Sequence, residues 1–309
     1  MNNIIIFQTR PGIGDIVLFL SGIHQIAKKN KKFNIYLITK ERTRAKDLLK
    51  DDKFIKKIIY INKFHNNKKI NLILETINIY KNLKKYKFEK AYIFHYGIRY
   101  FFLCKLLKIR TIFKYDFLKK NENISEKIFT TVKNWLKIKN YKREANIYLN
   151  RKVNIKNNKT IVLGIGSSGK SRRWPIQRFI QLIKLINQKK SHKFYLVAGK
   201  NEQKDASIIL QNTKDINVES LCDKNIYEIM QIIKNSKLYV GTDSAFMHIA
   251  AAIKIRTYAL FGDTPLNYAE YTKRIYPIIP KNYKTITHGS NAMKKIKCMD
   301  VWKTINKFI

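Results

Sequence analysis

The sequence predicts an α/β protein built from two Rossmann-like domains, each a parallel sheet wrapped by helices. Three observations support this. Short β-branched or aromatic runs alternate with longer helical patterns along the chain. Glycine-containing loops follow strands in both halves. The chain of 309 residues has room for two domains at the usual size of roughly 150 residues each. Two such domains facing each other across a cleft are the simplest architecture.

The first half of the sequence predicts a parallel sheet with helices between its strands. Strand-like runs occupy residues 3–8, 34–38, 57–61, 90–95 and 111–115. From Asp15 to Lys29, apolar residues recur at spacings of three and four, which is the pattern of one buried helix face. Residues 120–157 are polar, basic and less regular, so we expect a helix and a connection there. We place the domain boundary near residue 155, giving domains 1–155 and 156–309.

The second half repeats the alternation more clearly. Strands are predicted at 160–164, 192–198, 216–220, 237–241 and 257–261. Helices are predicted from Pro175 onwards, at 202–212, 225–235 and 244–253, and as a closing helix within 291–309. Pro175 suits the start of its helix, because the N–H that proline lacks is not needed there.

Composition limits the location and the chemistry. No segment reaches the ~18–20 consecutive apolar residues of a membrane span, and the N-terminus leads directly into a strand-like run, so we expect a soluble, cytoplasmic protein. The three cysteines, Cys104, Cys222 and Cys298, are widely separated and odd in number. This pattern favours neither a disulfide framework nor a zinc site, and we expect no metal.

The formal net charge of +42 favours an anionic partner, either a membrane surface, a phosphorylated glycolipid or a nucleic acid. A compositional origin competes with this. The chain is rich in Lys, Asn and Ile and its lysines are scattered through every predicted helix, as an AT-rich coding sequence would produce, and we favour that origin as the main source of the charge. No helix-turn-helix, zinc finger or aromatic RNA-binding motif supports specific nucleic-acid binding.

The first candidate loop follows the opening strand and reads Pro-Gly12-Ile-Gly14-Asp15. Glycines at the carboxyl end of a strand let the backbone approach a ligand closely. The third glycine of a dinucleotide-binding fingerprint is replaced by Val17, so that fingerprint is incomplete. Asp15 could act as a general base, or it could only cap the first helix; the loop alone slightly favours the cap.

A second candidate loop, residues 164–175, combines small residues, hydroxyl groups and cations ahead of a helix. Such a loop can surround phosphate oxygens with N–H groups while the cations neutralise their charge. The spacing of Gly164, Gly169, Lys170 and Ser171 also meets the P-loop pattern. The Trp-Pro pair that follows delays the helix beyond the P-loop position, so we favour a sugar-nucleotide phosphate loop over a P-loop or a merely solvated basic loop.

The third candidate segment, residues 238–252, reads as a strand, a tight turn and a helix. Asp243 or Ser244 is suited to the N-cap of this helix. The N–H groups and the positive end of the helix dipole can hold a phosphate or a diphosphate there. Two phosphate-binding loops indicate an enzyme with a phosphate-bearing donor.

Together these three segments resemble those of the glycosyltransferase family 9 heptosyltransferases, in similar order and spacing, as does the trailing run from Ala259 to Pro265. The resemblance is strongest at residues 4–30 and 158–265. It implies a GT-B fold, with an N-terminal domain that binds the acceptor and a C-terminal domain that binds the donor. The implied reaction transfers a heptose from ADP-heptose to the core of lipopolysaccharide, with inversion and without a metal or another cofactor.

The resemblance also implies roles for individual residues. Asp15 matches the catalytic base, which removes the proton of the acceptor hydroxyl, and Gly12 and Gly14 form the acceptor-side loop. The residues matched to donor binding are Ser167, Ser168, Lys170, Arg172, Glu202, Asp243, Ser244, Ala245, Phe246, Met247 and His248. Among them, Asp243 is matched to the sugar and Glu202 to the ribose hydroxyls, while the amides of residues 244–248 are matched to the diphosphate.

Two positions depart from the family pattern. Arg172 stands where the family has a lysine, which keeps the charge but changes the geometry. Ala245 stands where the family usually has glycine, and its methyl group could crowd the diphosphate. The His248 ring could face the ligand or belong to the core.

The partners that we expect are a nucleotide-sugar donor, an anionic glycolipid acceptor and the inner face of the cytoplasmic membrane. The aromatic run at residues 100–102 could form a membrane-facing or acceptor-side patch, although packing is the favoured interpretation. A nucleic-acid-binding protein and an inactive relative of the family are the alternatives.

Overall fold

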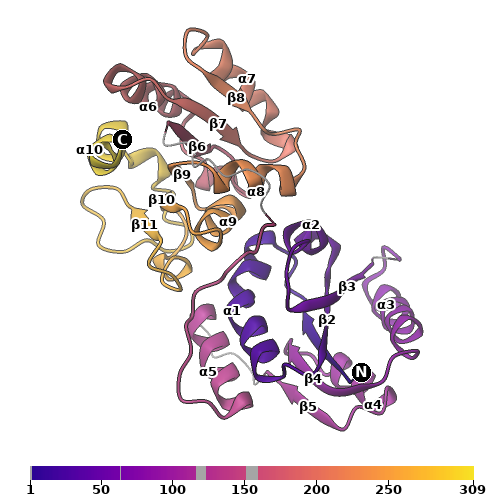
Figure 1. Cartoon of the computed structure of the whole chain (residues 1–309). Helices are drawn as coiled ribbons and strands as arrows, with labels where there is room; N and C mark the ends of the chain where they lie inside the picture. The colour runs from indigo at the N-terminus through magenta and orange to yellow at the C-terminus, as the bar shows by residue number, and fades with distance from the viewer. Residues whose placement is uncertain (1, 63, 116–122, 151–158) are drawn as a thin grey trace. The chain divides into compact units, whose positions relative to one another are not determined.

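The computed structural model describes the chain except residues 1, 63, 116–122 and 151–158 (Figure 1). It forms two compact units, Met1–Arg143 and Glu144–Ile309. The boundary predicted near residue 155 lies outside the described residues. The chain joins the second unit at Glu144, whose carboxylate pairs with Arg274 at 2.8 Å, and the Ile147 N–H then donates to the Ala252 carbonyl at 3.1 Å. The connection predicted before residue 157 therefore packs partly as a piece of the second unit.

The first unit contains a five-stranded sheet in the order β3-β2-β1-β4-β5, and every neighbouring pair is parallel. Its strands are β1 (Asn3–Gln8), β2 (Asn34–Lys40), β3 (Ile55–Ile61), β4 (Phe88–Phe94) and β5 (Thr111–Lys114). The five predicted strands are confirmed. Every residue of β1 is buried, as expected for a central strand that is covered on both faces.

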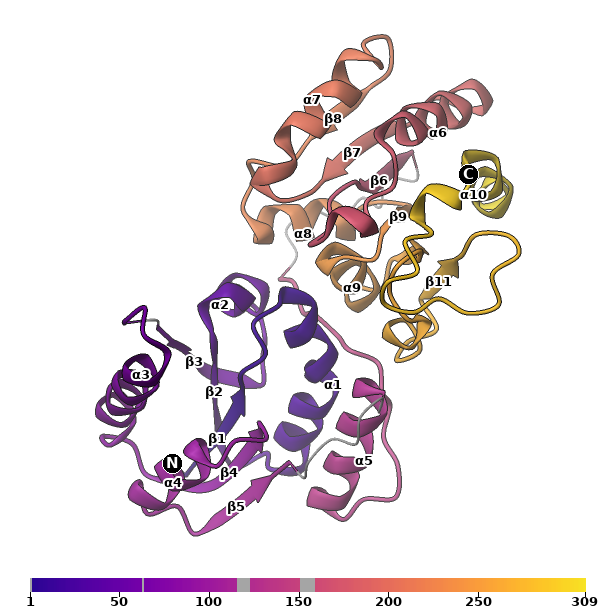
Figure 2. The same cartoon turned by 180° about the vertical axis from the view of Figure 1, so that it is seen from behind.

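Helices cover both faces of this first sheet (Figures 1 and 2). They are α1 (Ile13–Lys29), α2 (Ala45–Leu48), α3 (Lys68–Leu83), α4 (Arg99–Leu106) and α5 (Ile124–Leu136), with a short 3₁₀ turn η1 (Glu41–Thr43). α1 and α5 lie together on one face. On the other face, α3 and α4 pack against β1 and β4 through Ile79, Leu83 and Tyr100. The first helix begins at Ile13, slightly earlier than predicted.

The second unit contains a six-stranded parallel sheet in the order β11-β10-β9-β6-β7-β8. Its strands are β6 (Thr160–Gly164), β7 (Lys193–Val197), β8 (Val218–Ser220), β9 (Leu238–Thr242), β10 (Arg256–Leu260) and β11 (Ile275–Ile278). The five predicted strands are confirmed, and β11 is an addition. β11 contains Pro277, which carries no N–H, and this is compatible with its place at the edge of the sheet.

The helices of the second unit again lie on both faces of the sheet. They are α6 (Ile176–Lys189), α7 (Gln203–Gln211), α8 (Ile226–Lys234), α9 (Ala245–Ala252) and α10 (Cys298–Ile305), with 3₁₀ turns η2 (Lys170–Arg172), η3 (Lys200–Glu202), η4 (Leu266–Tyr268), η5 (Met293–Lys295) and η6 (Asn306–Phe308). Side chains of α6, α7 and α10 share one apolar core with β6 and β7.

The closing helix predicted within 291–309 is shorter than expected. The Ala292 N–H donates to the Gly262 carbonyl at 2.7 Å, and Met293 lies so close that a Cβ on Gly262 would come within 2.4 Å of its backbone. These contacts hold residues 292–295 against the loop after β10, so the α-helix starts only at Cys298.

In each sheet there is one point, the switch point, from which the chain adds strands first toward one edge and then toward the other. In the first unit it lies between β1 and β4, and in the second between β6 and β9. Ligands of open α/β sheets bind outside the carboxyl ends of the strands at such a switch point, because the connections there diverge to opposite faces. The loops after these four strands are therefore the places to look for a site.

None of the helices in the described ranges is long and apolar enough to span a bilayer. The three cysteines are free and buried.

Candidate active site

The switch point of the second unit is formed on one side by the turn from β9 into α9. Ser244 occupies the N-cap position, and its side chain makes no capping hydrogen bond to the first turn. The first N–H groups of a helix have no partner within the helix, and the helix dipole makes this end positive. Ser244, Ala245 and Phe246 are partly exposed, so this turn is accessible to an anion.

The loop after β6 lies directly against that turn. The Thr242 hydroxyl donates to the Gly166 carbonyl at 2.6 Å, and the Ser167 hydroxyl is 3.4 Å from the Asp243 carbonyl that accepts its hydrogen bond. A Cβ on Gly166 would come within 2.9 Å of the Ala198 Cβ, so only glycine allows this approach. The structure thus brings together two segments that are about 76 positions apart in sequence.

The cations of this loop are carried on η2, which is held in place by Asp263. Ser171 donates to Asp263 through its hydroxyl at 2.5 Å, and Asn291 donates through its N–H at 2.9 Å. The hydrogen bond from Ser171, followed by that from Asn291, lowers the pKa of Asp263. Lys170 is exposed and Arg172 is partly exposed, so their charges remain accessible.

The P-loop alternative does not fit this geometry. A P-loop lysine stands at the start of a helix that follows the glycine-rich turn directly. Here Lys170 begins a 3₁₀ turn, and α6 starts only at Ile176, after the Trp174 ring has entered the core. The buried Trp174 anchors the end of the loop because its indole N–H donates to the Ile296 carbonyl at 2.9 Å.

Glu202 and His248 of the predicted donor set are already engaged by protein groups. Glu202 is buried, accepts from the Gly199 N–H at 3.0 Å and pairs with Arg173. The His248 ring is buried, with Nδ1 3.1 Å from the Tyr271 hydroxyl. Burial also raises the pKa of that hydroxyl. The His248 ring therefore belongs to the core, and Met247 is fully buried too, whereas Ser168 is exposed.

In the first unit, the loop after β1 presents Asp15 in the first turn of α1. One carboxylate oxygen accepts the Gly12 N–H at 3.0 Å, and the other pairs with Arg10 Nε at 2.8 Å. A Cβ on Gly12 would come within 2.7 Å of the carboxylate, which explains the glycine there; Gly14 lies inside the first turn. Asp15 makes the capping contact, and it is also partly exposed. A carboxylate has about four lone-pair positions, so two contacts leave it able to accept a further proton.

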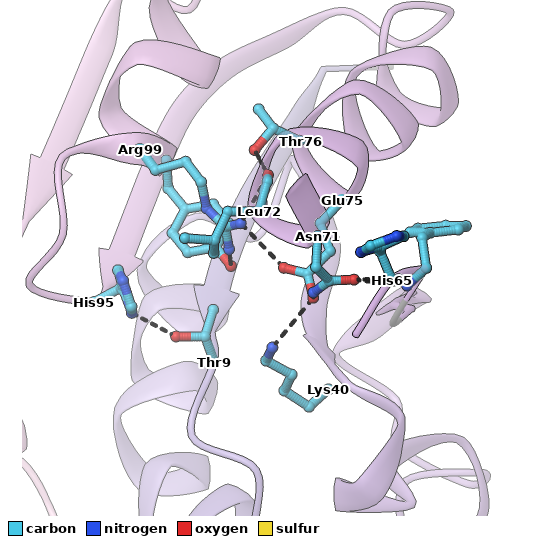
Figure 3. Close-up of polar contacts among 11 residues, drawn as sticks. Thr9, Lys40, His65, Asn71, Leu72, Glu75, Thr76, His95 and Arg99 are labelled. Carbon is cyan, nitrogen blue, oxygen red and sulfur yellow. Dashed lines mark hydrogen bonds and ion pairs between the residues drawn. The ribbon is translucent and has the colours of Figure 1, made fainter. Parts of the chain in front are cut away.

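A second polar cluster lies at the carboxyl ends of β1, β2 and β4, and the sequence did not indicate it (Figure 3). Its centre is Glu75, whose side chain is 3% exposed. Glu75 pairs with Arg99 at 3.0 Å and with Lys40 at 3.7 Å, and it accepts from the Asn71 amide at 2.8 Å. A buried carboxylate needs such partners, since an unpaired charge away from water is costly. One available signal was that Glu75 is the only acidic residue of α3.

His95 and Thr9 lie at the switch point itself, next to this cluster (Figure 3). His95 follows β4 and Thr9 follows β1, and the Thr9 hydroxyl is 2.7 Å from His95 Nδ1. Burial, and then the positive charges of Arg99, Lys40 and Lys114, lower the pKa of His95. The lowered pKa favours the neutral imidazole, which shares a hydrogen bond with the Thr9 hydroxyl.

The matching family model is that of glycosyltransferase family 9 (heptosyltransferase), and it matches residues 110–303. The chain belongs to glycosyltransferase family 9. Among curated relatives, a lipooligosaccharide heptosyltransferase 2 of Campylobacter jejuni is 30% identical over 189 residues, which are 58% of this chain and 59% of that protein. The chain spans 59% and 64% of the lengths of the two curated relatives it matches.

Solved structures share the GT-B architecture of this family 9 chain. The E. coli ADP-heptose lipopolysaccharide heptosyltransferase II aligns with a TM-score of 0.79 at 14% identity, covering 99% of this chain and 98% of that one. The E. coli heptosyltransferase WaaC with ADP aligns with a TM-score of 0.78 at 12% identity, covering 99% and 100%. At these identities the comparison establishes the fold: two parallel-sheet, Rossmann-like units.

Within this family 9 fold, the predicted site residues fall into two groups. Gly12, Gly14 and Asp15 lie at the switch point of the first unit, and the loop from Ser167 to Arg172 meets the Asp243 turn at that of the second. In the described ranges, no three His, Cys, Asp or Glu side chains are grouped as they would be around a metal ion.

Proposed function

We propose that the chain is an inverting, metal-independent glycosyltransferase that moves a heptose from ADP-heptose to a lipid-linked core saccharide. The observation that carries this proposal is the set of chemical groups at the two switch points. One carries a solvent-accessible carboxylate, Asp15, and the other carries an uncapped helix start beside a loop with cations and hydroxyl groups. In this proposal residues 1–155 bind the acceptor and residues 156–309 bind the donor.

Donor binding relies on backbone groups around the start of α9. The amides of residues 244–248 would hold the diphosphate, with Ser167 and Ser168 beside them and Lys170 and Arg172 neutralising its charge. His248 and Met247 would contribute only their N–H groups, because both side chains are buried. Asp243 would position the sugar and Glu202 the ribose. One solved structure of similar fold holds ADP, which is compatible with this donor.

The reaction is a single displacement. Asp15 takes the proton of the acceptor hydroxyl, whose oxygen forms a bond to the anomeric carbon of the heptose. The bond from that carbon to the diphosphate oxygen breaks, and ADP leaves with the electron pair and the charge that the α9 amides stabilise. Attack from the side opposite the leaving group inverts the anomeric centre. The Gly12 N–H and Arg10 hold the carboxylate in place for this transfer.

The acceptor we propose is an anionic glycolipid at the inner face of the cytoplasmic membrane. Lys40 and Arg99 give the carboxyl edge of the first sheet a positive potential that Glu75 only partly offsets. The curated relatives named for lipooligosaccharide heptose transfer are compatible with this acceptor class. Specific nucleic-acid binding is not part of the proposal.

The donor half is tested by calorimetry with ADP, UDP and GDP at moderate salt, which screens unspecific attraction to so cationic a chain. We expect selective ADP binding that Arg172→Ala weakens about tenfold, since a charge-assisted hydrogen bond contributes about 1.5–3 kcal/mol. Preference for UDP or GDP would keep the reaction class and overturn the donor. Absence of nucleotide binding would favour an inactive relative.

The catalytic half is tested by Asp15→Asn, which keeps an oxygen for the Gly12 N–H but loses the basic carboxylate. We expect transfer to fall by about 10²–10⁴, the usual contribution of a general base, with ADP affinity unchanged. Asp47→Asn is the matched control, because Asp47 also lies in the first turn of a helix of the first unit and pairs with an arginine, Arg44, at 2.8 Å. Full activity in Asp15→Asn would remove Asp15 from the mechanism.

A further inference from the structure

Exposed apolar side chains are concentrated in one stretch of the first unit. Of the thirteen large apolar side chains that the described residues leave exposed, ten lie between Phe64 and Leu106. These ten are Phe64, Ile70, Leu72, Ile73, Leu74, Ile77, Tyr80, Ile98, Phe102 and Leu106. Single exposed apolar residues are normal, but a gathered set marks an interaction surface. We call this set the α3–α4 patch.

The α3 part of the patch is a helical stripe that faces solvent. Ile70, Ile73, Leu74 and Ile77 are spaced by three, four and seven positions, which puts them on one face of the helix. The stripe is distinct from the face that anchors α3 to the sheet, where Glu75, Ile79 and Leu83 recur every four positions and are all buried. α3 therefore has a second apolar face that the first unit does not use for its own core.

α4 continues the patch. Ile98, Phe102 and Leu106 recur every four positions and are exposed, whereas Tyr100, Leu103 and Cys104 pack into the core. Packing, the favoured interpretation of the aromatic run at 100–102, is thus correct for Tyr100 and wrong for Phe102, which is 56% exposed. Arg99 joins the two helices, because its guanidinium donates to the Leu72 carbonyl at 3.2 Å as well as to Glu75. α3 and α4 are neighbours in both views (Figures 1 and 2).

The charge around the patch has a single sign. Between Asn62 and Tyr115 the sequence carries thirteen lysines and arginines but only two acidic residues, Glu75 and Glu89. Glu75 is buried, and Glu89 lies in β4 rather than on either helix. The exposed lysines on α3, just after it and on α4 are Lys69, Lys81, Lys84, Lys85 and Lys105. The patch thus combines exposed apolar side chains with exposed lysines on the same two helices.

A polar hollow of about 400 Å³ lies beside α3, between that helix and the edge strand β3. Three lysines, Lys46, Lys57 and Lys85, line it together with a single acidic residue, Glu41, so cations outnumber carboxylates there. Three asparagines also line it, two of which belong to α3. Lysine ammonium and asparagine amide groups are donors suited to phosphate oxygens. The hollow therefore gives anionic headgroups a place next to the apolar stripe.

We propose that the α3–α4 patch docks the first unit on the surface of an anionic lipid bilayer. The apolar stripes of α3 and α4 would enter the boundary between headgroups and acyl chains, while the flanking lysines and the hollow meet lipid phosphates. A second copy of this chain is a poor occupant, because each copy carries +42 and brings the same lysines to the contact. An anionic lipid bilayer complements both the apolar stripes and the exposed lysines, because it offers phosphates at its surface and acyl chains beneath them.

The inference deepens the proposed function, on whose lipid-linked acceptor it rests. It places the contact on two named helices, one of which also holds Glu75 beside Lys40 and Arg99 at the sheet edge. It also gives part of the charge a role, because exposed lysines lie on the same two helices as the apolar stripes.

The test is co-sedimentation of the full chain with vesicles of phosphatidylglycerol and phosphatidylethanolamine. Pure phosphatidylcholine vesicles are the neutral comparison. Binding is measured at low salt and near 1 M salt, where the Debye length is about 3 Å and long-range attraction is screened. We expect wild type to keep binding the anionic vesicles at high salt. The combined variant Ile73→Asn, Ile77→Asn and Phe102→Asn should lose at least about tenfold in high-salt partitioning, because it removes three inserted side chains.

A matched control changes the three exposed apolar residues outside the patch. Ile208→Asn, Tyr276→Asn and Met299→Asn remove the same number of exposed apolar side chains from the second unit. We expect this control to bind vesicles as wild type does. Equal high-salt binding by both triple variants would overturn the proposal. So would a dimer in sedimentation velocity that the patch variant abolishes without any vesicle binding, since that would assign the patch to self-association.

A second measurement does not depend on the triple variants. Ile77→Cys and Ile208→Cys are each labelled with an environment-sensitive dye, and anionic vesicles should shift the emission to shorter wavelength only at position 77. A shift at both positions or at neither would contradict the proposal. ADP binding in the same preparations separates the two hypotheses: vesicle docking without ADP binding would reject the proposed function alone, and the reverse would reject the docking surface alone.

Discussion

The carboxyl edges of the two sheets have the same topology and different chemistry. In the first unit, charged side chains hold one another: Asp15 with Arg10, and Glu75 with Arg99 and Lys40. In the second unit, the loop after β6 and the turn after β9 meet through backbone groups and hydroxyls, as between Thr242 and Gly166 or between Ser167 and Asp243. The position of a site thus follows from the strand order, whereas its chemistry depends on the few residues after each strand.

The largest expected difference between the two edges concerns buried charge. Glu75→Gln keeps the shape of the side chain but leaves Arg99 and Lys40 without their carboxylate. We expect a loss of about 2–3 kcal/mol in the free energy of unfolding, below the ~3–5 kcal/mol of a fully buried pair because both cations keep access to water. Urea unfolding measures it. Glu89→Gln, on exposed β4 surface, is the control, and an equal effect of both changes would contradict this account.

The second edge should instead be sensitive to a side chain added at a glycine whose backbone is closely packed. A Cβ on Gly164 would come within 1.7 Å of the Tyr239 hydroxyl, whereas a Cβ on Gly169 would meet nothing closer than 3.9 Å. We expect Gly164→Ala to lower the free energy of unfolding by about 2 kcal/mol through overpacking, and Gly169→Ala to change it little. Thermal unfolding compares the two. Adding Tyr239→Phe should restore part of the loss, and no recovery would mean that the strain lies elsewhere.

The smallest expected effect concerns Asp263, a carboxylate that helps to hold the loop after β6 at the second edge. Hydrogen bonds from Ser171 and Asn291 lower its pKa in the folded state. The folded protein therefore binds its proton less readily than the unfolded chain, so this stabilisation is present above about pH 4 and is lost as the pH falls through the folded pKa. Ser171→Ala should cost about 1 kcal/mol at neutral pH. The melting temperature of the Ser171→Ala variant should also fall less steeply than that of wild type between neutral and acidic pH. If the melting temperatures of the two proteins fell in parallel, Ser171 would not be the cause of the lowered pKa of Asp263.

The sequence was sufficient for features with strong local signals. Ten strands, the loop glycines and the family followed from apolar runs and short motifs, because these depend on residues close together in the chain. β11 was missed, since Pro277 interrupts a short run and an edge strand needs only one neighbour. The closing helix was overextended because the packing of Met293 against Gly262 joins distant segments.

The Glu75 cluster was missed for a related reason. Its members Lys40, Glu75 and Arg99 come from three separate elements, and only the parallel order of β2, β1 and β4 brings those elements to one edge. Conversely, Phe102 reads as a core residue by composition, and only the orientation of α4 exposes it.

The two apolar faces of α3 also determine which sequence changes this helix can tolerate. Each added residue turns the rest of a helix by about 100°. A single residue inserted between Ile70 and Glu75 would thus rotate one part of α3 relative to the other. Either Glu75 and the buried residues after it would leave the core, or Ile70 would no longer share a face with Ile77. Point substitutions on either face affect one contact at a time. A shift in phase breaks the buried ion pairs and the outer stripe together, so α3 should tolerate replacements far better than changes in length.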